Sequence, residues 1–257
     1  MLDQLFNRVG AVAFRCHRIV PFLSISGATR ILFHAGGAGS ALLLAGCAGT
    51  YSALDPAGPH AHTIAQLWWA MLLGAALLFV LVMGLFVLTL FRPGFGSGVS
   101  TKGWIVAGGL LLPIPVLVAL TFYALVQGER LLPGGGDGVP AYRIEAHARQ
   151  WQWEFRYLDE PGAPTTVDVL HIPAGLPVEV VATSEDVIHS FWVPRLGGKI
   201  DATPGHAARI RIHADRPGHF GGVCAEYCGT GHSRMRFRVE AHEQPEFRSL
   251  VERGFEQ

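Results

Sequence analysis

The chain lacks charged residues over two long stretches. The chain has 257 residues, and it contains no Asp, Glu, Lys or Arg between Asp55 and Arg92 or between Lys102 and Glu129. As a helix, residues 64–91 would extend about 42 Å at about 1.5 Å per residue, which exceeds the roughly 30 Å of a bilayer's hydrocarbon core. Uncharged runs of this length are typical of membrane spans, and a pair of buried helices in a water-soluble core is the weaker interpretation. The sequence therefore predicts two transmembrane helices, at residues 64–91 and 103–127.

The composition also lacks an excess of either charge. Twenty Lys and Arg residues balance twenty Asp and Glu residues, so nothing in the balance favours nucleic acid or an acidic partner. There is no C-x-x-C-H motif, which excludes a haem attached to this chain through that motif. Cysteine is scarce, with four in the chain. Cys16 and Cys47 fall early, which leaves Cys224 and Cys228 for chemistry in the second half.

The charges that flank the uncharged runs predict an orientation. The connection at residues 92–102 carries Arg92 and Lys102 and no acid, whereas residues 48–63 carry no Lys or Arg. Short cytoplasmic loops are enriched in positive charge. The resulting prediction is an outer-face N-terminal segment at 47–63, a cytoplasmic loop at 92–102, a linker at 128–140 and an outer domain at 141–257.

Residues 1–46 have the pattern of a targeting segment. Four arginines precede the apolar stretch ILFHAGGAGSALLLAG. This stretch ends in Leu44-Ala45-Gly46-Cys47, which resembles the lipobox of bacterial lipoproteins, where cleavage before the cysteine leaves a lipid-modified N-terminus. We therefore expect removal of residues 1–46 and lipidation of Cys47. The alternative is a chance run of small residues before an unmodified cysteine.

The outer domain reads as β structure almost throughout. Residues 151–157, WQWEFRY, alternate aromatic and polar side chains, which predicts a strand with four rings on one face. Short β-prone runs at 167–172 and 178–183 are separated by the turn signals EPGAP and PAGLP. Several short strands at this spacing favour a sandwich or a small barrel. Only residues 245–255 have helical character.

One stretch of this domain carries an unusual set of side chains. The segment GVCAEYCGTGHSRM places Cys224, Cys228, His232 and Met235 within a dozen residues. Thiolate, imidazole and thioether together suit copper, whereas a thioether is a poor choice for zinc. A mononuclear blue copper site needs one cysteine and two histidines, so the second cysteine favours two copper ions bridged by two thiolates.

Spacing alone leaves other interpretations of this cluster open. A cysteine pair outside the cytoplasm can form a disulfide, and clusters of cysteine and histidine are often zinc sites. A copper site would also need a second histidine. Spacing does not select it among the seven other histidines of the domain.

The cluster and three further motifs resemble the cytochrome c oxidase subunit II family. Residues 224–235 match C-x-E-x-C-x-x-x-H-x-x-M, and QWQW at 150–153, VIHSFWVP at 187–194 and KIDATPG at 199–205 occur upstream in the family's order. The resemblance covers about residues 52–247. It implies a two-helix transmembrane hairpin followed by an all-β cupredoxin-like Greek-key sandwich or barrel.

The resemblance also implies a ligand set for two copper ions. Cys224 and Cys228 would bridge the ions, and His189 and His232 would each bind one of them. Met235 and the backbone carbonyl of Glu226 would be weak outer ligands.

Other residues take roles from the same resemblance. Trp151 would be the point at which electrons enter, although without the family match a buried strand tryptophan is the plainer interpretation. The Glu226 side chain would reach a magnesium ion shared with a partner subunit, or would simply be a solvated acid. Asp186, Lys199 and Asp201 are candidates for interface or docking contacts only.

The function implied is that of the electron-entry subunit of a cytochrome c oxidase. The chain would be a multi-pass protein of the bacterial inner membrane with its C-terminal domain in the periplasm. It would accept single electrons from a periplasmic cytochrome c or small copper protein. These electrons would pass to haem and copper centres in subunit I, where oxygen is reduced to water and protons are pumped. Subunit III and membrane lipid are further expected partners, and haem is expected only in the partner subunit.

Two other functions compete with this one. A quinol oxidase subunit II shares the fold but normally lacks the copper ligands. A membrane-anchored copper-delivery protein would keep the ligands without needing Trp151, a partner-facing Glu226 or a helix pair. Residues 103–112 contain no acid, so the proton-channel glutamate that many relatives carry there is not expected in this chain.

Overall fold

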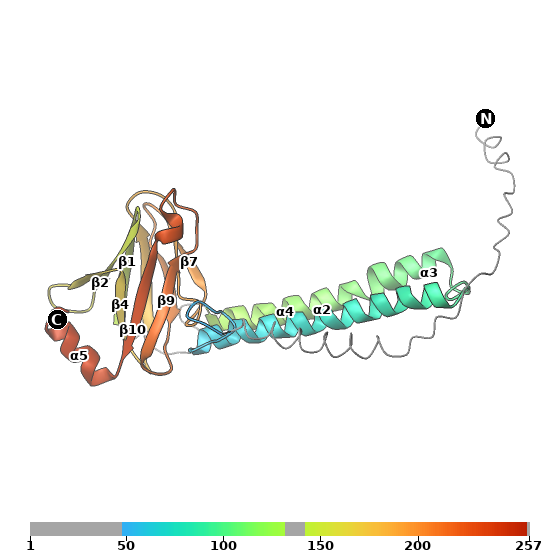
Figure 1. Cartoon of the computed structure of the whole chain (residues 1–257), viewed down its shortest axis with the longest axis horizontal. Helices are drawn as coiled ribbons and strands as arrows, with labels where there is room; N and C mark the ends of the chain where they lie inside the picture. The colour runs from blue at the N-terminus through green and yellow to red at the C-terminus, as the bar shows by residue number, and fades with distance from the viewer. Residues whose placement is uncertain (1–47, 132–141, 256–257) are drawn as a thin grey trace, which may run out of the picture. The chain divides into compact units, whose positions relative to one another are not determined.

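A computed structural model describes residues 48–131 and 142–255 (Figure 1). The expected targeting segment 1–46 and the expected lipidation site Cys47 lie outside the described residues, as does most of the expected linker. The described chain begins with two helical arms, continues through ten strands and ends in the short helix α5 (Gln244–Glu252).

The first helix, α2 (Pro59–Phe91), begins before residue 64, where the uncharged pattern had placed the span. The reason is a contact with the β domain. The backbone of Ala57 accepts a hydrogen bond from Asp215 N at 2.9 Å and donates one to Arg195 O at 2.8 Å. A Cβ atom on Gly58 would lie 1.9 Å from the carbonyl oxygen of His213, so only glycine fits there. Because Ala57 and Gly58 are held against the β domain, helix α2 begins at the next residue, Pro59.

The second helical arm is interrupted before its proline. It consists of α3 (Thr101–Val106), a π-helical turn η2 (Ala107–Leu111) and α4 (Pro113–Leu131). Leu112 N donates to Ala107 O at 3.0 Å, a wide turn that precedes Pro113. Proline has no backbone N–H to donate, and its ring clashes with the carbonyl four residues earlier. A π-helical turn before the proline moves that carbonyl away and keeps the helix continuous.

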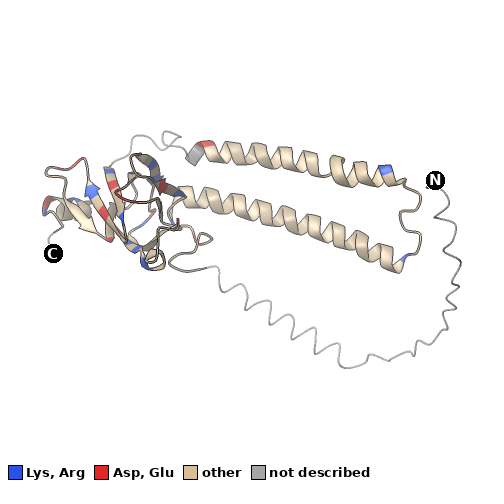
Figure 2. Cartoon of the chain, turned by 90° about the horizontal axis from the view of Figure 1, so that it is seen from above, with Lys and Arg blue, Asp and Glu red and all other residues tan. Residues whose placement is uncertain are grey.

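Both helical arms are long and apolar enough to cross a membrane. Figure 2 shows them free of charged residues except near their ends. Most of their large apolar side chains are exposed in the isolated chain, among them Phe79, Phe91 and Phe122. Exposed apolar surface of this extent is expected only where lipid or another protein covers it.

The β domain contains two five-stranded sheets. The first sheet has the strand order β3-β2-β1-β5-β8, and the second has the order β4-β10-β9-β6-β7. The strands of the first sheet are β1 (Tyr142–Arg149), β2 (Gln152–Tyr157), β3 (Thr165–Val167), β5 (Val178–Ser184) and β8 (Ala208–Ile212). Those of the second are β4 (Val169–Pro173), β6 (His189–Trp192), β7 (Lys199–Ala202), β9 (Gly218–Cys224) and β10 (Arg236–His242).

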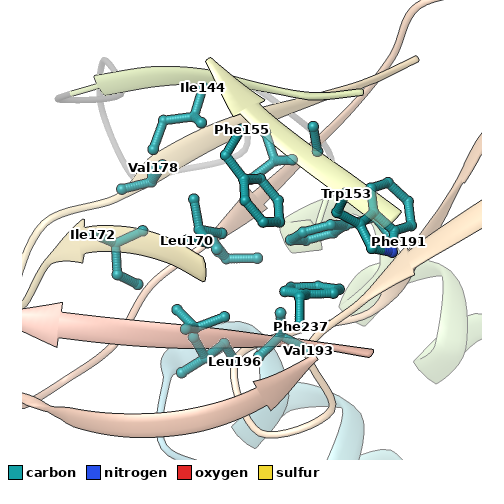
Figure 3. Packing of buried hydrophobic residues seen from close by; sticks show 14 of the residues in the cluster. Ile144, Trp153, Phe155, Leu170, Ile172, Val178, Phe191, Val193, Leu196 and Phe237 are labelled. Carbon is teal, nitrogen blue, oxygen red and sulfur yellow. The ribbon is translucent and has the colours of Figure 1, made fainter. Parts of the chain in front are cut away.

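An aromatic core lies between the sheets, as Figure 3 shows. Trp153, Phe155 and Tyr157 alternate inward along β2 and are buried. The ring of Trp153 lies 5.8 Å from that of Phe191, which stacks on Phe237 at 5.0 Å. The prediction of four rings on one face is wrong for Trp151, which precedes the strand in a turn and is 40% exposed. The expected two-helix hairpin followed by an all-β cupredoxin-like sandwich is confirmed.

The run at residues 167–172 is two strands rather than the single one predicted. Strand β3 belongs to the first sheet and β4 to the second. Between them Asp168 has a φ of 55°, a turned conformation that carries the chain from one sheet to the other. The Asp168 side chain accepts a hydrogen bond from Trp153 N at 2.9 Å, which ties this crossing point to β2.

Candidate metal centre

Most of the expected ligands lie on the connection between β9 and β10. Cys224 is the last residue of β9 and Met235 immediately precedes β10, and these two strands pair along their length. The connection folds back through a 3-10 turn at His232–Arg234, and Cys224 N donates to Met235 O at 3.0 Å. The loop therefore returns to its starting point with its sulfur and imidazole groups together.

His189 is brought to this cluster from a different strand. It is the first residue of β6, which pairs with β9 so that Phe191 lies opposite Cys224. Its side chain is fully buried, and Nδ1 lies 3.8 Å from Cys224 Sγ and 3.2 Å from Met235 Sδ. The ring packs against Trp153 at 6.2 Å, so the aromatic core also fixes its position. His189 is thus the second histidine that spacing could not select.

Cys228 lies at the middle of the cluster. Its Sγ atom is 3.8 Å from Cys224 Sγ, 3.6 Å from His232 Nδ1 and 3.7 Å from Met235 Sδ. The carbonyl oxygen of Glu226 lies 3.2 Å from Cys224 Sγ. The structure therefore brings together all six donor atoms that the family resemblance implied.

The spacing of these donors fits metal coordination. Two donors that each bind one ion at about 2.0–2.3 Å in a roughly tetrahedral arrangement lie about 3.3–3.8 Å apart. The separations from 3.2 to 3.8 Å fall close to this range. Because a thioether and a carbonyl accompany the thiolates and imidazoles, the donor set suits copper better than zinc.

The two cysteines are free thiols in the structure. Their sulfur atoms are 3.8 Å apart, whereas a disulfide bond is about 2.05 Å long. Burial and the neighbouring Cys224 raise the pKa of the Cys228 thiol to about 12. Two thiolates this close are therefore unfavourable unless a cation lies between them.

Asp186 is a site residue whose role the sequence analysis missed. The His189 Nε2 atom lies 2.9 Å from Asp186 Oδ1, on the side of the ring away from the sulfur atoms. Burial raises the pKa of Asp186, but hydrogen bonds from His189 and from the backbone N–H groups of Gln150 and Val187 outweigh it and lower the pKa overall. The three-residue spacing of Asp186 and His189 was the available signal, since a ligating histidine commonly donates its other N–H to a carboxylate.

Trp151 links the cluster to the surface. Its indole N–H donates to Cys228 O at 3.1 Å, and Gln150 Nε2 donates to the same oxygen at 2.9 Å. A Cβ atom on Gly231 would lie 2.3 Å from Trp151 Cδ2, so the ring lies directly on the glycine. The plainer interpretation of Trp151 as a buried strand residue is therefore wrong.

The three expected interface residues differ in where they lie. Asp186 belongs to the cluster, as described above. The Lys199 ammonium lies 3.8 Å from the Glu226 carboxylate and 3.6 Å from that of Asp201, and all three side chains are about half exposed. The Glu226 side chain therefore points away from the donors that its own carbonyl joins.

Fold and cluster together define a class of protein: a β-sandwich domain preceded by two apolar helices, with a buried copper-type ligand cluster. Residues 163–242 match the family model for the cytochrome c oxidase subunit II periplasmic domain. The chain belongs to the cytochrome c oxidase subunit II family. It is accordingly a membrane protein whose C-terminal domain is periplasmic.

Individual relatives differ in the oxidase to which they belong. The chain is 35% identical over 225 residues to cytochrome c oxidase subunit 2 of Alkalihalophilus pseudofirmus. The matched region covers 82% of this chain and 65% of that protein. It is 30% identical over 227 residues to quinol oxidase subunit 2 of Bacillus cereus. The matched region covers 82% of this chain and 75% of that protein. The crystal structure of the periplasmic domain of Bradyrhizobium japonicum cytochrome oxidase subunit II covers 46% of this chain and 96% of its own, at 30% identity and a TM-score of 0.44.

Proposed function

We propose that this chain is the electron-entry subunit of a cytochrome c oxidase. It accepts single electrons from a periplasmic donor at a binuclear copper site and passes them to haem and copper centres in subunit I. There oxygen is reduced to water and protons are pumped. The observation that carries the proposal is the convergence of two thiols, two imidazoles, a thioether and a carbonyl in one cluster.

The ligands of the proposed site are those that the family resemblance implies, and the distances between their donor atoms support them. Cys224 and Cys228 would hold both copper ions through their thiolates, while His189 and His232 would each bind one ion. Met235 and the Glu226 carbonyl are the weak ligands. When bound, the copper pair supplies a centre that takes up and releases one electron at a time.

The protein's own contribution to this proposed role is a rigid set of donors. His189 and Cys224 lie on paired strands, and Cys228 and Met235 are buried. Donors held by strands and by a packed core move little when charge changes, and burial excludes water from them. The Asp186 carboxylate keeps His189 Nε2 protonated, so that Nδ1 presents its lone pair toward the sulfur atoms.

Trp151 is the proposed point of entry. One face of its ring is available to a docking partner, and its N–H is bonded to the carbonyl of a bridging cysteine. An electron would therefore pass from the protein surface to the cluster through the Trp151 side chain and its hydrogen bond to Cys228 O. The donor is a cytochrome c or a small copper protein.

The relatives named as quinol oxidase subunits make the choice of donor a real question. A subunit that takes electrons from quinol has no need for the copper ligands, whereas this chain gathers the full set. A copper-delivery protein would need the ligands but not the exposed Trp151 bonded to them. The combination of complete ligands and an exposed indole supports the cytochrome c oxidase role.

Several finer features belong to the same proposal. The two apolar helices span the bilayer, with the loop at 92–102 in the cytoplasm and the segment 47–63 and domain 141–257 outside. Subunits I and III cover the apolar helix surface. The Glu226 carboxylate, half exposed beside Lys199, is available to a magnesium ion shared with subunit I. Cys47 carries the lipid after residues 1–46 are removed.

The test of electron entry uses the purified oxidase complex and two aromatic variants. Trp151→Phe removes the indole N–H. Tyr227→Leu removes an exposed ring on the β9–β10 connection, whose centroid lies 5.8 Å from that of the His232 ring. We expect Trp151→Phe to slow oxidation of reduced cytochrome c by about tenfold or more, roughly 1.4 kcal/mol in activation free energy, with unchanged copper content. Tyr227→Leu should leave the rate near the wild-type value. Equal rates for Trp151→Phe and wild type would overturn Trp151 as the entry point.

A further inference from the structure

A second cluster of histidine and carboxylate side chains lies on the outer face of the β4–β10 pair. It is formed by His171, Glu240 and His242, whose donor atoms all lie within 4.8 Å of one another. The copper-type cluster adjoins the first residue of β10, and His242 is the last of that seven-residue strand. At about 3.3 Å per residue, the two clusters are roughly 20 Å apart.

Strand pairing brings these three residues to the same place. Strands β4 and β10 are parallel, and His171 lies directly opposite Glu240. His242 follows Glu240 by two residues, so its side chain is on the same face of β10. The residues on either side of Glu240, Val239 and Ala241, point into the core. The register of the two strands therefore places these three side chains next to one another.

The donor atoms face one another, and the two imidazole nitrogens share a hydrogen bond whose proton a bound cation would replace. His171 Nδ1 lies 2.9 Å from His242 Nε2 and 3.6 Å from Glu240 Oε2. The two rings are stacked, with centroids 5.1 Å apart and planes 25° apart. The side chains of His171 and His242 are only 9% and 12% exposed. Two imidazole nitrogens and a carboxylate oxygen thus form an almost buried set of three donors.

A fourth side chain orients one of the donors. Helix α5 places Glu246 Oε1 3.3 Å from Nδ1 of His242, on the far side of that ring from His171. This carboxylate favours a proton on Nδ1 and leaves the Nε2 lone pair directed at the cluster. A carboxylate behind a histidine is the usual support for a metal ligand.

The surroundings of His171 fix its position. The Phe255 ring stacks on the His171 ring, with centroids 5.1 Å apart. The backbone N–H of His171 donates to the Tyr157 hydroxyl at 2.8 Å, and that hydroxyl donates to the His171 carbonyl at 3.1 Å. These contacts hold the ring and backbone of His171 in place.

We propose that His171, His242 and Glu240 bind one divalent cation of the zinc class, with Glu246 as the carboxylate that positions His242. Two imidazoles and one carboxylate are a donor set that zinc accepts, with water in the remaining position. The site adjoins a surface hollow lined by Thr165, Arg238 and Phe255, through which an ion and its water can enter. Two carboxylates against the single guanidinium of Arg238 leave a net negative charge for the cation.

The experiment measures zinc binding by the full chain in detergent, with copper already loaded so that the cysteines are occupied. We expect wild type to bind one more zinc ion per chain than His171→Gln or His242→Gln. Glu246→Gln should keep the site with an affinity about 10–100-fold lower. His206→Gln, which removes an exposed histidine elsewhere on the domain, should match wild type.

The outcomes separate this inference from the electron-entry proposal. Equal zinc content in wild type and both histidine variants would overturn the site, even if the copper signal is intact. If one histidine variant fails to fold, Glu240→Gln serves in its place, and zinc should raise the thermal midpoint of wild type but not of Glu240→Gln. A lack of copper binding at Cys224 and Cys228, with zinc still bound at the histidines, would instead contradict only the proposed function.

Discussion

The Asp186 carboxylate lies 2.9 Å from Nε2 of His189, while Nδ1 of the same ring faces Cys224 and Met235. One imidazole thus joins a carboxylate that is 30% exposed to the buried sulfur atoms. Asp186 also accepts hydrogen bonds from Gln150 N at 2.7 Å and Val187 N at 2.6 Å. The loop before β6 and the turn that carries Trp151 are therefore held by the same carboxylate.

This relationship predicts a loss of copper affinity in Asp186→Asn. The amide keeps one oxygen acceptor, so it loses one of the two backbone hydrogen bonds, which go to different carboxylate oxygens, and it removes the charge that favours a proton on His189 Nε2. We expect affinity about 10–100-fold weaker, as for other supports of metal-binding histidines. Competition with a copper chelator measures the change. Asp201→Asn, at an exposed carboxylate beside Lys199, is the matched control, and equal affinities in the two variants would contradict the role of Asp186.

A second prediction concerns the close contact between Gly231 and Trp151. Gly231 has φ −89° and ψ −2°, which alanine also adopts, so Gly231→Ala tests space alone. Its methyl group would lie 2.3 Å from the indole and would displace it from the Cys228 carbonyl. We expect a loss of about 1–3 kcal/mol in unfolding free energy and slower electron entry.

The control for this steric prediction is Gly198→Ala. A methyl group there would meet its nearest neighbour at 3.7 Å, an ordinary contact. Denaturant unfolding of the full chain in detergent and donor oxidation by the complex are the two readouts. A Gly231→Ala variant that matches Gly198→Ala in both would show that the position of Trp151 does not matter.

The acid dependence of stability gives a third prediction. Asp159 accepts hydrogen bonds from the side chain and the backbone of Arg143, and these hold the pKa of Asp159 below its ordinary value of 3.8. A carboxyl whose pKa is lowered by folding contributes stability that is complete above the unfolded pKa and is lost as the pH falls through the folded pKa. Wild type should therefore be more stable than Asp159→Asn from pH 7 down to about pH 4, with the difference shrinking at lower pH.

Unfolding midpoints of wild type and Asp159→Asn across this pH range provide the test. The neighbouring Glu160→Gln is the control for the loss of a negative charge at the same turn. A difference between wild type and Asp159→Asn that stays constant from pH 7 to well below pH 3 would contradict the assignment.

The architecture could be predicted from the sequence because its strongest signals are local. Uncharged runs define helices by length, and alternation along residues 153–157 defines a strand with a buried face. The start of α2 at Pro59 could not be predicted, since it depends on Gly58 packing against a carbonyl more than a hundred residues away. The split of residues 167–172 between two sheets likewise depends on the φ of Asp168, which no periodic pattern encodes.

The candidate site divides in the same way. Cys224, Cys228, His232 and Met235 lie on one loop, so their spacing alone indicated a cluster. His189 begins another strand and Asp186 lies in the loop before it, and only the family resemblance supplied His189. The exposure of Trp151 was missed because alternation continues through it, although the chain turns before β2 begins. The cluster at His171 gave no sequence signal, because it arises from pairing between strands that are far apart along the chain.

In the proposed function, the cluster around Cys224 and Cys228 holds two copper ions that share one unpaired electron. The most direct measurement is the copper content of the full chain in detergent, together with its electron paramagnetic resonance spectrum. We predict two copper ions per chain and a signal delocalised over both copper nuclei, abolished in Cys228→Ser. A single copper ion with a localised signal, or a spectrum that Cys228→Ser leaves unchanged, would contradict the account.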